Sequence, residues 1–335
     1  MAAKKTTDKA PGASPGARRD SDASARPPIE GIALKEDMTL DELLRSMRSC
    51  GLQASQLAKA DEIIAEAQGA KAKIILTFTT NLVSSGMREV FARLCREKKV
   101  NAIITAIGSI EEDVMKTRVP FRLATFEEDD RALHKAGLNR VGNIIIPNEA
   151  YVELEKMLKP FFLRCLQKQE KLKRLLAPHE MIRDLGLELD DEESFVYWAA
   201  KNNIPIFCPA PTDGAFGLQM YFFKQAYPGF GVDASGDLPK LGQIVLDAEK
   251  TAGIILGGGV AKHHAIGANI LREGFDYAVY VSTGTPYDGS LSGARTSEAV
   301  SWGKIKEGAK TVHVDADATL VFPMLAYRML KHGSA

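Results

Sequence analysis

Short runs of apolar, often β-branched residues recur along the chain, and longer stretches with a helical apolar period separate them. Such nearly continuous runs are typical of strands that are covered on both faces of a parallel sheet. They lie at AKIILTFT (72–79), NAIITAIG (101–108), NIIIP (143–147), IPIFCPA (204–210), AGIILGGG (252–259), DYAVYVST (276–283) and TVHVDAD (311–317). We predict a strand at each run.

The stretches between the runs predict helices, for example SSGMREVFARLCREKK (84–99) and ATLVFPMLAYRMLK (318–331). Alternating strands and helices indicate an α/β fold: a Rossmann-like, doubly wound, mostly parallel sheet with right-handed crossovers and helices on both faces. Residues 148–203 carry no strand signal, so we predict a helical insertion there, packed at one end of the sheet. Residues 31–335 are interpreted as one domain.

The first residues of the chain differ from the rest. Residues 1–27 are rich in Ala, Pro, Ser, Gly and charged residues, and they contain no aromatic residue. A segment of this composition cannot bury enough apolar surface to offset the entropy lost on ordering. We predict a disordered N-terminal tail over residues 1–30.

Charge and cysteine content narrow the class of protein. The 43 Lys and Arg balance 43 Asp and Glu, which removes the electrostatic argument for a general nucleic-acid or membrane partner. The four cysteines form no CxxC or Cys/His cluster, so we expect buried free thiols and a reduced, cytoplasmic compartment. No apolar run reaches about 18 residues and no hydrophobic signal segment opens the chain, so we expect neither a membrane span nor secretion.

The residues that could carry chemistry follow the predicted strands, at the strand ends where open parallel sheets bind ligands. TTNLVSSG (79–86) follows the first run with hydroxyls and an amide, which suit a phosphate or ribose and equally suit helix capping. AIGSIEED (106–113) places Gly108 at a strand end and Glu111 and Glu112 in the next helical turn. These carboxylates suit the helix dipole, and they also suit a ribose or a cationic substrate.

Three further strand ends carry glycine, histidine or acid. LGGGVAKHH (256–264) lets a backbone approach a ligand closely. Its adjacent histidines point in different directions on a helix, so we expect no shared metal, with one histidine at a pocket and the other packed. APTDGAFG (210–217) contains Asp213, which also fits an ordinary turn, and VDADATLVFP (314–323) contains Asp315 and Asp317. Several acids on one rim suggest a site for amines or ribose hydroxyls.

Lys304 is the least ordinary charged residue of the sequence. It follows Trp302 and Gly303 in SEAVSWGKIKEG (297–308), with Val300 and Ile305 as apolar neighbours. Desolvation lowers the pKa of a lysine ammonium and favours the neutral amine, which forms Schiff bases with carbonyls and exchanges with imines. We interpret Lys304 as a candidate nucleophile set among the strand ends.

An ordered set of motifs carries a family resemblance. From about residue 51 to about residue 325 the chain resembles the deoxyhypusine synthase family. The motifs are TNLVSSG, IEED, RVGNIIIPNE, PTDG, ILGGGVAKHH, SGAR and EAVSWGKI. The resemblance implies a homotetramer that binds NAD at subunit interfaces.

The same resemblance implies a reaction. NAD takes a hydride from a polyamine such as spermidine, amine exchange puts a butylimine on Lys304, and the retained NADH reduces the product after transfer to an acceptor amine. In the synthase the acceptor is a lysine of the translation factor 5A precursor, whereas a homospermidine synthase of the family uses putrescine.

Site residues are carried over by position in the matching motifs. His263 resembles the histidine that assists proton transfer, Glu298 and Trp302 resemble the wall of the amine tunnel, and Glu111 faces the same cationic substrate. The implied NAD contacts are Thr80, Asn81, Ser84, Gly108, Glu112, Asp213, Gly258, Thr283, Asp317 and Ala318. No metal site is implied.

Departures from the family pattern concentrate at the amine-recognition end. Leu218 and Leu291 stand where the family has aspartates, and Gly267 stands where it has asparagine; the NAD loop has Ala106 and Ile107 in place of Thr and Ala. A hydrogen bond to a charged group contributes roughly 1.5–3 kcal/mol, so losing two weakens ammonium binding by about 10²–10⁴-fold. Three hypotheses follow: a spermidine-dependent transferase, a homospermidine synthase-like enzyme or one acting on another amine, and a regulatory paralogue that activates a partner subunit.

Overall fold

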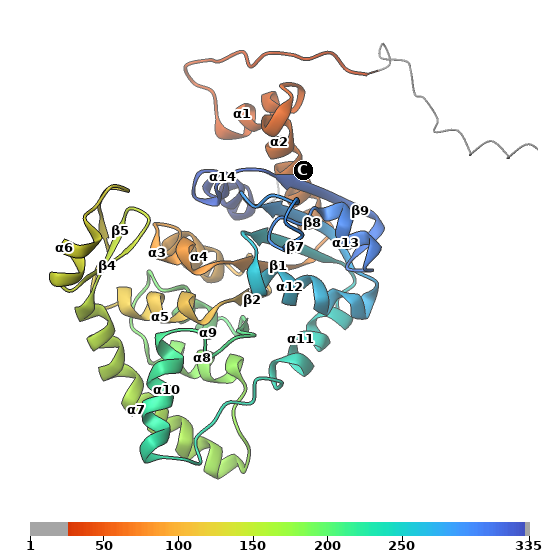
Figure 1. Cartoon of the computed structure of the whole chain (residues 1–335). Helices are drawn as coiled ribbons and strands as arrows, with labels where there is room; N and C mark the ends of the chain where they lie inside the picture. Colours follow the sequence, from red (N-terminus) through yellow and green to blue (C-terminus); the bar gives the residue numbers. More distant parts are fainter. Residues whose placement is uncertain (1–25, 332–335) are drawn as a thin grey trace, which may run out of the picture.

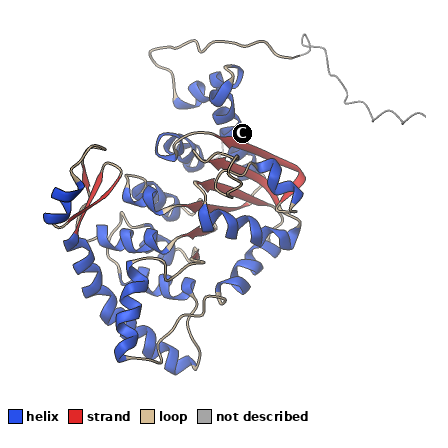
Figure 2. Cartoon of the chain, in the orientation of Figure 1, coloured by secondary structure: helices blue, strands red, loops and turns tan. Residues whose placement is uncertain are grey.

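The computed structural model describes residues 26–331. Residues 1–25, which make up most of the predicted disordered tail, lie outside the described residues. Within 26–331 the chain has the predicted α/β architecture, with a parallel sheet between two layers of helices (Figures 1 and 2).

The main sheet has six parallel strands in the order β6-β2-β1-β7-β8-β9. Their bounds are β1 Lys73–Phe78, β2 Ala102–Thr105, β6 Ile206–Phe207, β7 Thr251–Leu256, β8 Phe275–Val281 and β9 Ile305–Val314. Counted along the chain, this is the spatial order 3-2-1-4-5-6 of a Rossmann sheet, in which the winding direction reverses between the first and fourth strands. The predicted fold class is therefore confirmed.

Side chains that alternate along the strands build a hydrophobic core on each face. Ile74, Leu76 and Val279 belong to the core on one face of the sheet, while Ile75 and Ala278 belong to the core on the other face. The helices are α2 Leu52–Gly69, α4 Arg88–Arg96 and α14 Ala318–Leu330 on one face, with α11 Asp237–Leu246, α12 Gly259–Ala268 and α13 Thr296–Ser301 on the other. The second face is called the α12 face below.

The remaining helices precede the sheet or join its strands. α1 (Leu40–Ser46) comes before α2, α3 (Thr80–Ser84) follows β1, and α5 (Ile107–Lys116) follows β2. α10 (Ala215–Ala226) follows β6 and packs against α5. Short 3-10 turns cover Met47–Ser49 and Asn269–Arg272.

The run NIIIP does not join the main sheet. It forms β5 (Ile144–Pro147), the middle strand of a small antiparallel sheet with β3 (Arg122–Leu123) and β4 (Leu138–Val141), next to α6 (Asp130–Lys135). Only two residues separate β4 from β5, and the first, Gly142, has φ +60°. A two-residue loop of this conformation makes a hairpin, which pairs neighbouring strands antiparallel. This small sheet forms an arm beside the main body (Figure 1).

Residues 148–203 form three helices: α7 Asn148–Leu172, α8 Pro178–Glu188 and α9 Phe195–Lys201. α7 packs on α5 and α10, while α9 packs on α4 and α8. The segment therefore packs on the helices that surround the β1–β2–β6 end of the sheet.

β9 is longer than its run predicts and is irregular. Phe275 of β8 pairs with Ile305, yet Tyr277 pairs with Lys310, so β9 bulges between these two points. The polar residues of the bulge explain why the apolar pattern showed only the second half of the strand.

The cysteines and helices of residues 26–331 bear on two of the expectations. Cys95, Cys165 and Cys208 are buried free thiols, as predicted, and Cys50 is free and half-buried. Within the described residues, no helix combines the length and apolar character that crossing a bilayer demands.

Candidate active site

The carboxyl ends of β1 and β7 meet where the sheet reverses its winding direction. Thr79 follows β1 and Gly257 follows β7, and a Cβ atom added to Gly257 would lie 3.0 Å from the Thr79 Oγ1 atom. Gly257 has φ +80°, a conformation that favours glycine. Doubly wound sheets bind ligands beyond the strand ends at this reversal point, so the TTNLVSSG and LGGGVAKHH motifs flank the expected ligand position.

Beside these strand ends, α3 and α5 bring several predicted residues together. A Cβ atom on Gly108 would lie 2.6 Å from the Thr80 Oγ1 atom, and the Ser84 hydroxyl donates a hydrogen bond to Glu112. Burial raises the pKa of Glu112 to about 7, and the neighbouring charge of Glu111 adds to the increase. The Glu112 carboxyl is thus buried without a cationic partner strong enough to offset its desolvation.

Glu111 is buried against the start of α10. Its carboxylate accepts a 2.7 Å hydrogen bond from the Phe216 amide, and Gly214 fits so closely that an added Cβ atom would lie 2.7 Å from the carboxylate. Burial raises the pKa of Glu111, as does the charge of nearby Asp213. Three predicted residues, Glu111, Glu112 and Asp213, therefore share one electrostatic environment.

The third acid of the same motif has a structural role. Asp113 is fully buried, and its carboxylate accepts a 2.7 Å hydrogen bond from the Arg88 guanidinium and one from the Ser194 hydroxyl. These contacts tie α5 to α4 and to the start of α9. Asp113 therefore stabilises the fold and leaves Glu111 and Glu112 as the candidate ligand contacts.

The other predicted cofactor residues lie further along the same edge. Asn81 follows β1 and is exposed, Thr283 follows β8 and is exposed, and Gly258 follows β7. Asp317 follows β9 and caps α14 by accepting a 2.7 Å hydrogen bond from the Thr319 amide; Ala318 begins that helix. The carboxyl edge thus carries predicted residues along its whole length.

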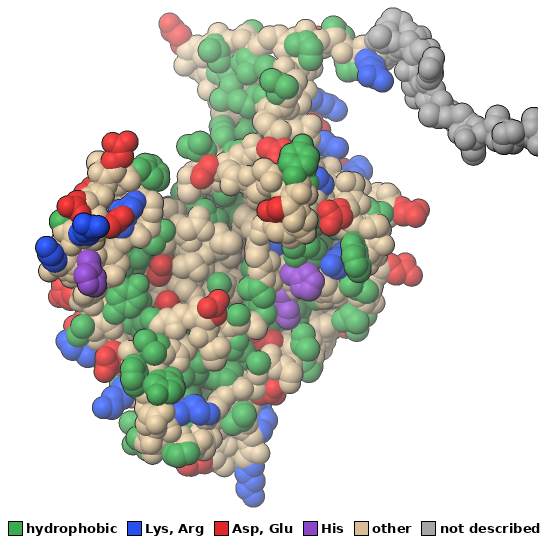
Figure 3. Space-filling model, viewed as in Figure 1, with side chains coloured by type: hydrophobic (Ala, Val, Ile, Leu, Met, Phe, Trp, Pro, Cys, Tyr) green, Lys and Arg blue, Asp and Glu red, His purple; other side chains and the backbone are tan. Residues whose placement is uncertain are grey.

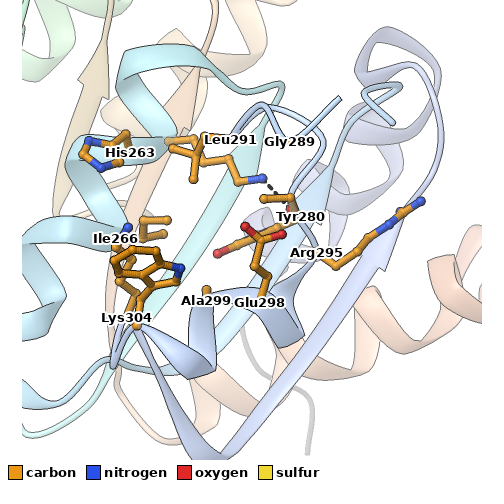
Figure 4. Close-up of a pocket in the computed structure, with 12 residues that line it drawn as sticks. His263, Ile266, Tyr280, Gly289, Leu291, Arg295, Glu298, Ala299 and Lys304 are labelled. Atoms are coloured by element: carbon orange, nitrogen blue, oxygen red, sulfur yellow. Dashed lines mark hydrogen bonds between the residues drawn. The ribbon is translucent and has the colours of Figure 1, made fainter. Parts of the chain in front are cut away.

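Lys304 lies in a different place, on the α12 face. It borders a cavity of about 330 Å³ between α12, α13 and the segment 282–295 (Figure 4). The cavity is lined by Lys262, His263, Ile266, Tyr280, Gly289, Leu291, Ala294, Arg295, Glu298, Ala299, Trp302 and Lys304. Four predicted residues, His263, Glu298, Trp302 and Lys304, are therefore brought together.

The backbone of Lys304 is held on both sides. Its amide donates a 2.9 Å hydrogen bond to the Ala299 carbonyl of α13, and its carbonyl accepts a 3.1 Å hydrogen bond from the Phe275 amide of β8. The residue is 8% exposed, and its Nζ atom lies 5.1 Å from the centroid of the Trp302 ring. The lysine is thus fixed at its base, while its amine lies within cation–π distance of an indole.

The other predicted pocket residues differ in exposure. His263 lines the cavity, whereas His264 is half-buried and its Nε2 atom has no hydrogen-bond partner within residues 26–331. Burial lowers the pKa of His264. Trp302 is 66% exposed and Glu298 is also exposed, so the cavity opens on this side.

Sequence reasoning missed three polar residues of the cavity. Lys262 is buried, and its ammonium donates a 2.7 Å hydrogen bond to the Ala294 carbonyl; burial lowers its pKa to about 8. Arg295 pairs with Asp315 at 2.5 Å, and Tyr280 reaches the cavity from β8. Lys262 precedes His263 in a motif already singled out, but the carbonyl that holds it comes from a distant loop that no local pattern reveals.

The structure corrects one expectation about Lys304. The sequence places it among the carboxyl strand ends, but Lys304 directly precedes β9 and so lies at the amino end of that strand. The cavity and the carboxyl edge meet instead at Ser292, whose hydroxyl accepts a 3.0 Å hydrogen bond from the Gly259 amide. The candidate residues of one chain therefore form two groups joined by the segment 282–295.

No group of three or more His, Cys, Asp or Glu side chains in residues 26–331 is arranged to hold a metal ion. The polar groups of the cavity and of the edge are amines, a guanidinium, an imidazole, an indole, carboxylates, hydroxyls and an amide. Groups of these kinds are able to form imines, transfer protons and hydrogen-bond a polar ligand.

Comparison with known proteins decides the family. The family model described as deoxyhypusine synthase matches residues 42–329. A protein of Pyrococcus abyssi named "Probable deoxyhypusine synthase" is 45% identical over 316 residues, which cover 90% of this chain and 94% of that protein. The chain belongs to the deoxyhypusine synthase family.

Further relatives agree with this assignment. A Halobacterium salinarum protein of the same name is 45% identical over 315 residues, covering 93% of both chains. A crystal structure from Entamoeba histolytica that bears the family name is 28% identical, with a TM-score of 0.64, and the match covers 90% of this chain and 96% of that one. The family and the fold are thus shown over nearly the whole chain.

The structure shows where the residues that depart from the deoxyhypusine synthase family pattern lie. Leu291 lines the Lys304 cavity, while Leu218 lies on an exposed face of α10 and is 53% exposed. Gly267 lies in α12, and a Cβ atom added there would meet no other atom within 4 Å. Ala106 is the N-cap of α5, and the next residue, Ile107, is buried in the core. The departure that directly alters the cavity is Leu291.

Proposed function

We propose that the chain catalyses the NAD-dependent transfer of a 4-aminobutyl group from a spermidine-like polyamine to an acceptor amine, with Lys304 as the covalent carrier. The observation that carries the proposal is the buried Lys304 side chain, which shares a cavity with an imidazole, a carboxylate and an indole. A lysine amine in such a setting suits imine exchange.

The side chains of the cavity have separate roles in this proposal. The Glu298 carboxylate attracts the ammonium group of the amine substrate, and the Trp302 ring offers it a face. The Lys304 Nζ atom adds to the imine carbon of the oxidised donor; the new C–N bond forms as the bond to the departing diamine breaks. His263 takes a proton from the attacking nitrogen and returns one to the departing nitrogen.

The carboxyl edge fits a dinucleotide. The N-cap residues of α5 and α12 are Ala106 and Gly258, which have no side-chain oxygen. No side-chain cap therefore occupies the backbone N–H groups at these helix starts, which leaves them for a ligand. Glu112 provides a buried carboxylate of the kind that binds ribose hydroxyls. When bound, NAD would accept a hydride from the carbon that bears the donor nitrogen and later return it. The proposed contacts are Thr80, Asn81, Ser84, Gly108, Glu112, Asp213, Gly258, Thr283, Asp317 and Ala318.

A second copy of the chain completes this arrangement in our proposal. The cavity is open at Glu298 and Trp302, which are both exposed in the single chain. Leu218, Tyr221 and Phe222 form an exposed apolar stripe at helical spacing on α10. Hydrophobic side chains gather over α7 and α10 in the space-filling view (Figure 3). We therefore propose that subunits associate through such surfaces into the expected homotetramer.

The acceptor proposed first is a lysine of the translation factor 5A precursor. A homospermidine synthase-like reaction, or one with another amine, is the second candidate, and Leu291 favours it. Leu291 places an apolar side chain in the cavity, where one of the two carboxylates expected for an ammonium group would lie. A donor with one charged end loses no binding energy when leucine replaces aspartate here, whereas a polyamine loses an ion pair.

The proposal is tested by incubating the purified full chain with NAD and single amines, namely spermidine, putrescine and agmatine. Amine-dependent NADH formation and a substrate-derived mass on Lys304 after borohydride reduction are the expected results. Adding the factor 5A precursor or putrescine as acceptor then separates the two candidates by product mass. Absence of NADH formation with every amine would reject the proposed activity.

A further inference from the structure

Asp315 is an acid that the sequence places on the rim of the sheet and that the roles above leave unassigned. It directly follows β9, but its carboxylate is occupied by protein groups. Its Oδ1 atom accepts a 2.5 Å hydrogen bond from the Arg295 guanidinium, and its Oδ2 atom accepts a 3.2 Å hydrogen bond from the Gln53 amide. By these contacts Asp315 supports the cavity and does not belong to the ligand positions of the edge.

The carboxylate of Asp315 is held from several sides. Gln53 lies in the first turn of α2, and its side-chain carbonyl also accepts a 2.8 Å hydrogen bond from the Asp315 amide. The Nε2 atom of His313, in the same strand end, lies 3.3 Å from the Asp315 Oδ1 atom. The carboxylate therefore has a position set by α2 and β9, to which Arg295 is then fixed.

Arg295 receives this anchor at the border of the Lys304 cavity. It is the N-cap residue of α13, and its side chain makes no capping hydrogen bond there. Figure 4 shows the side chain extending away from Lys304, so the guanidinium does not approach the reacting amine. Arg295 thus connects the end of β9 to the start of α13.

α13 carries two of the residues to which the proposed function assigns the amine. Glu298 is its third residue and Trp302 is its C-cap. The helix has only six residues, and helices this short are not stable by themselves in water. The direction in which the Glu298 carboxylate points therefore depends on what holds α13 from outside.

The anchors of α13 lie at its two ends. At its end the Lys304 amide bonds to it, as described above. At its start the Thr311 hydroxyl of β9 donates a 3.2 Å hydrogen bond to the Thr296 hydroxyl, and Arg295 bonds to Asp315. The bond to Asp315 is the shorter of the two anchors at the start and the one that involves charges, so it is the stronger.

We propose that Asp315 is a positioning residue for the amine substrate. Through Arg295 it holds the first turn of α13 so that the Glu298 carboxylate faces the ammonium group in the cavity. This inference rests on the proposed function and deepens it. Asp315 contacts neither the amine nor Lys304, and no covalent bond to it forms or breaks. It acts through geometry, because a hydrogen bond weakens steeply when its distance or angle is wrong.

The test is Asp315→Asn, which keeps the size of the side chain and removes its charge. We expect the KM of the amine in amine-dependent NADH formation to rise by about tenfold, with kcat within threefold and NAD affinity within twofold of the wild type. In a Glu298→Gln background the same substitution should have no further effect on KM, because Asp315 acts through Glu298.

Glu66→Gln is the matched control, since it removes another ion pair between α2 and β9, that of Glu66 with Lys310. It should leave the KM of the amine within twofold of the wild type. The ion pairs of Glu66 and Asp315 are both partly exposed, so both single variants should unfold within about 3 °C of the wild type.

Every other result counts against the inference. An amine KM within twofold of the wild type in Asp315→Asn, or a loss of kcat and thermal stability alone, would show that Asp315 only supports the fold. Additive effects of Asp315→Asn and Glu298→Gln would show that Asp315 does not act through Glu298. If Glu298→Gln alone does not raise KM, the role of Glu298 fails together with the inference. If the wild type forms no NADH with any amine, the proposed function itself fails.

Discussion

The carboxyl edge and the Lys304 cavity are two differently built parts of one candidate site. The candidate residues of the edge follow the carboxyl ends of all six strands of the main sheet. Several of them also hydrogen-bond the backbone, as Asp317 does in capping α14. The cavity draws nearly all its residues from α12 and from residues 289–304, which pack together on one face. A dispersed edge suits an extended ligand, whereas a compact cavity suits the control of a single reacting atom.

The two parts also differ in how their charges are held. At the edge, Glu112 has a pKa raised to about 7 by burial, so a carboxyl is kept at a cost to stability. In the cavity, Lys262 is the most buried cation; two carbonyls accept hydrogen bonds from it, although burial still lowers its pKa to about 8. Substitutions in one part should therefore leave the other intact, and the following predictions examine this separation from the largest expected effect to the smallest.

Lys304→Ala should abolish transfer while leaving the edge unaffected. We expect the transfer rate to fall by about 10³-fold or more and the borohydride adduct to disappear, because the proposed covalent carrier is lost. NAD affinity, measured by calorimetry, should stay within twofold of the wild type. Lys310→Ala, at an exposed lysine of β9, is the control. An adduct that survives Lys304→Ala would sink the assigned role.

Glu112→Gln should stabilise the fold and weaken NAD binding. Below about pH 4.5 the carboxyl is protonated in both states; between about 4.5 and 7 only the unfolded chain ionises, so the free energy of unfolding falls as pH rises. The variant should therefore be more stable than the wild type by roughly 3 kcal/mol at pH 8, with no difference near pH 4.

Denaturant unfolding across this pH range measures the effect, and Glu155→Gln on the exposed side of α7 is the control. Equal stability of Glu112→Gln and the wild type at pH 8 would show that Glu112 is not a buried, destabilising carboxyl. Unchanged NAD affinity would remove Glu112 from the proposed contacts.

Leu291→Asp should change amine preference within the cavity. A carboxylate there adds a charge-assisted hydrogen bond, so the kcat/KM ratio of spermidine to putrescine should rise by about 10- to 100-fold. Leu291→Asn has nearly the same size and no charge, and it should leave the ratio within threefold. If both variants shift the ratio equally, size and not charge sets the preference.

Gly267→Ala should have the smallest effect. It should raise the stability of the fold, whereas the corresponding change at the edge, Gly108→Ala, should lower it. No atom lies within 4 Å of an added Cβ, so alanine should stabilise α12 by about 0.5–1 kcal/mol. At Gly108 the added Cβ would meet Thr80, so Gly108→Ala should destabilise the fold. Thermal unfolding of the two variants measures both signs; stabilisation at Gly108 would contradict the close packing of α3 on α5.

Much of the sheet is predictable from sequence because its central strands are covered on both faces. The runs for β1, β7 and β8 predict the first strand residue to within one position. The run NIIIP has the same composition but joins the small sheet, because the hairpin at Gly142 decides its partner and an apolar run does not. Apolar pattern therefore indicates that a strand exists, while turn geometry decides which sheet it joins.

The candidate site is predictable where a motif is local and unpredictable where packing brings distant segments together. His263, Glu298 and Trp302 lie close to motif glycines or to Lys304 in sequence, and the structure places them at the cavity. Lys262 and Tyr280 depend on carbonyls and rings from other elements, so no local pattern marks them. Trp302 also shows that an apolar neighbourhood in sequence need not be buried.

The bulge in β9 has a practical consequence for protein engineering. Ile305 pairs with Phe275 and Lys310 pairs with Tyr277, so the exposed residues Glu307 and Gly308 belong to the extra, unpaired length of strand between these two pairs. Exposed irregular segments of this kind tolerate added residues. A short peptide label inserted between Glu307 and Gly308 would therefore report on events near Lys304 without displacing the lysine or the strand beyond it.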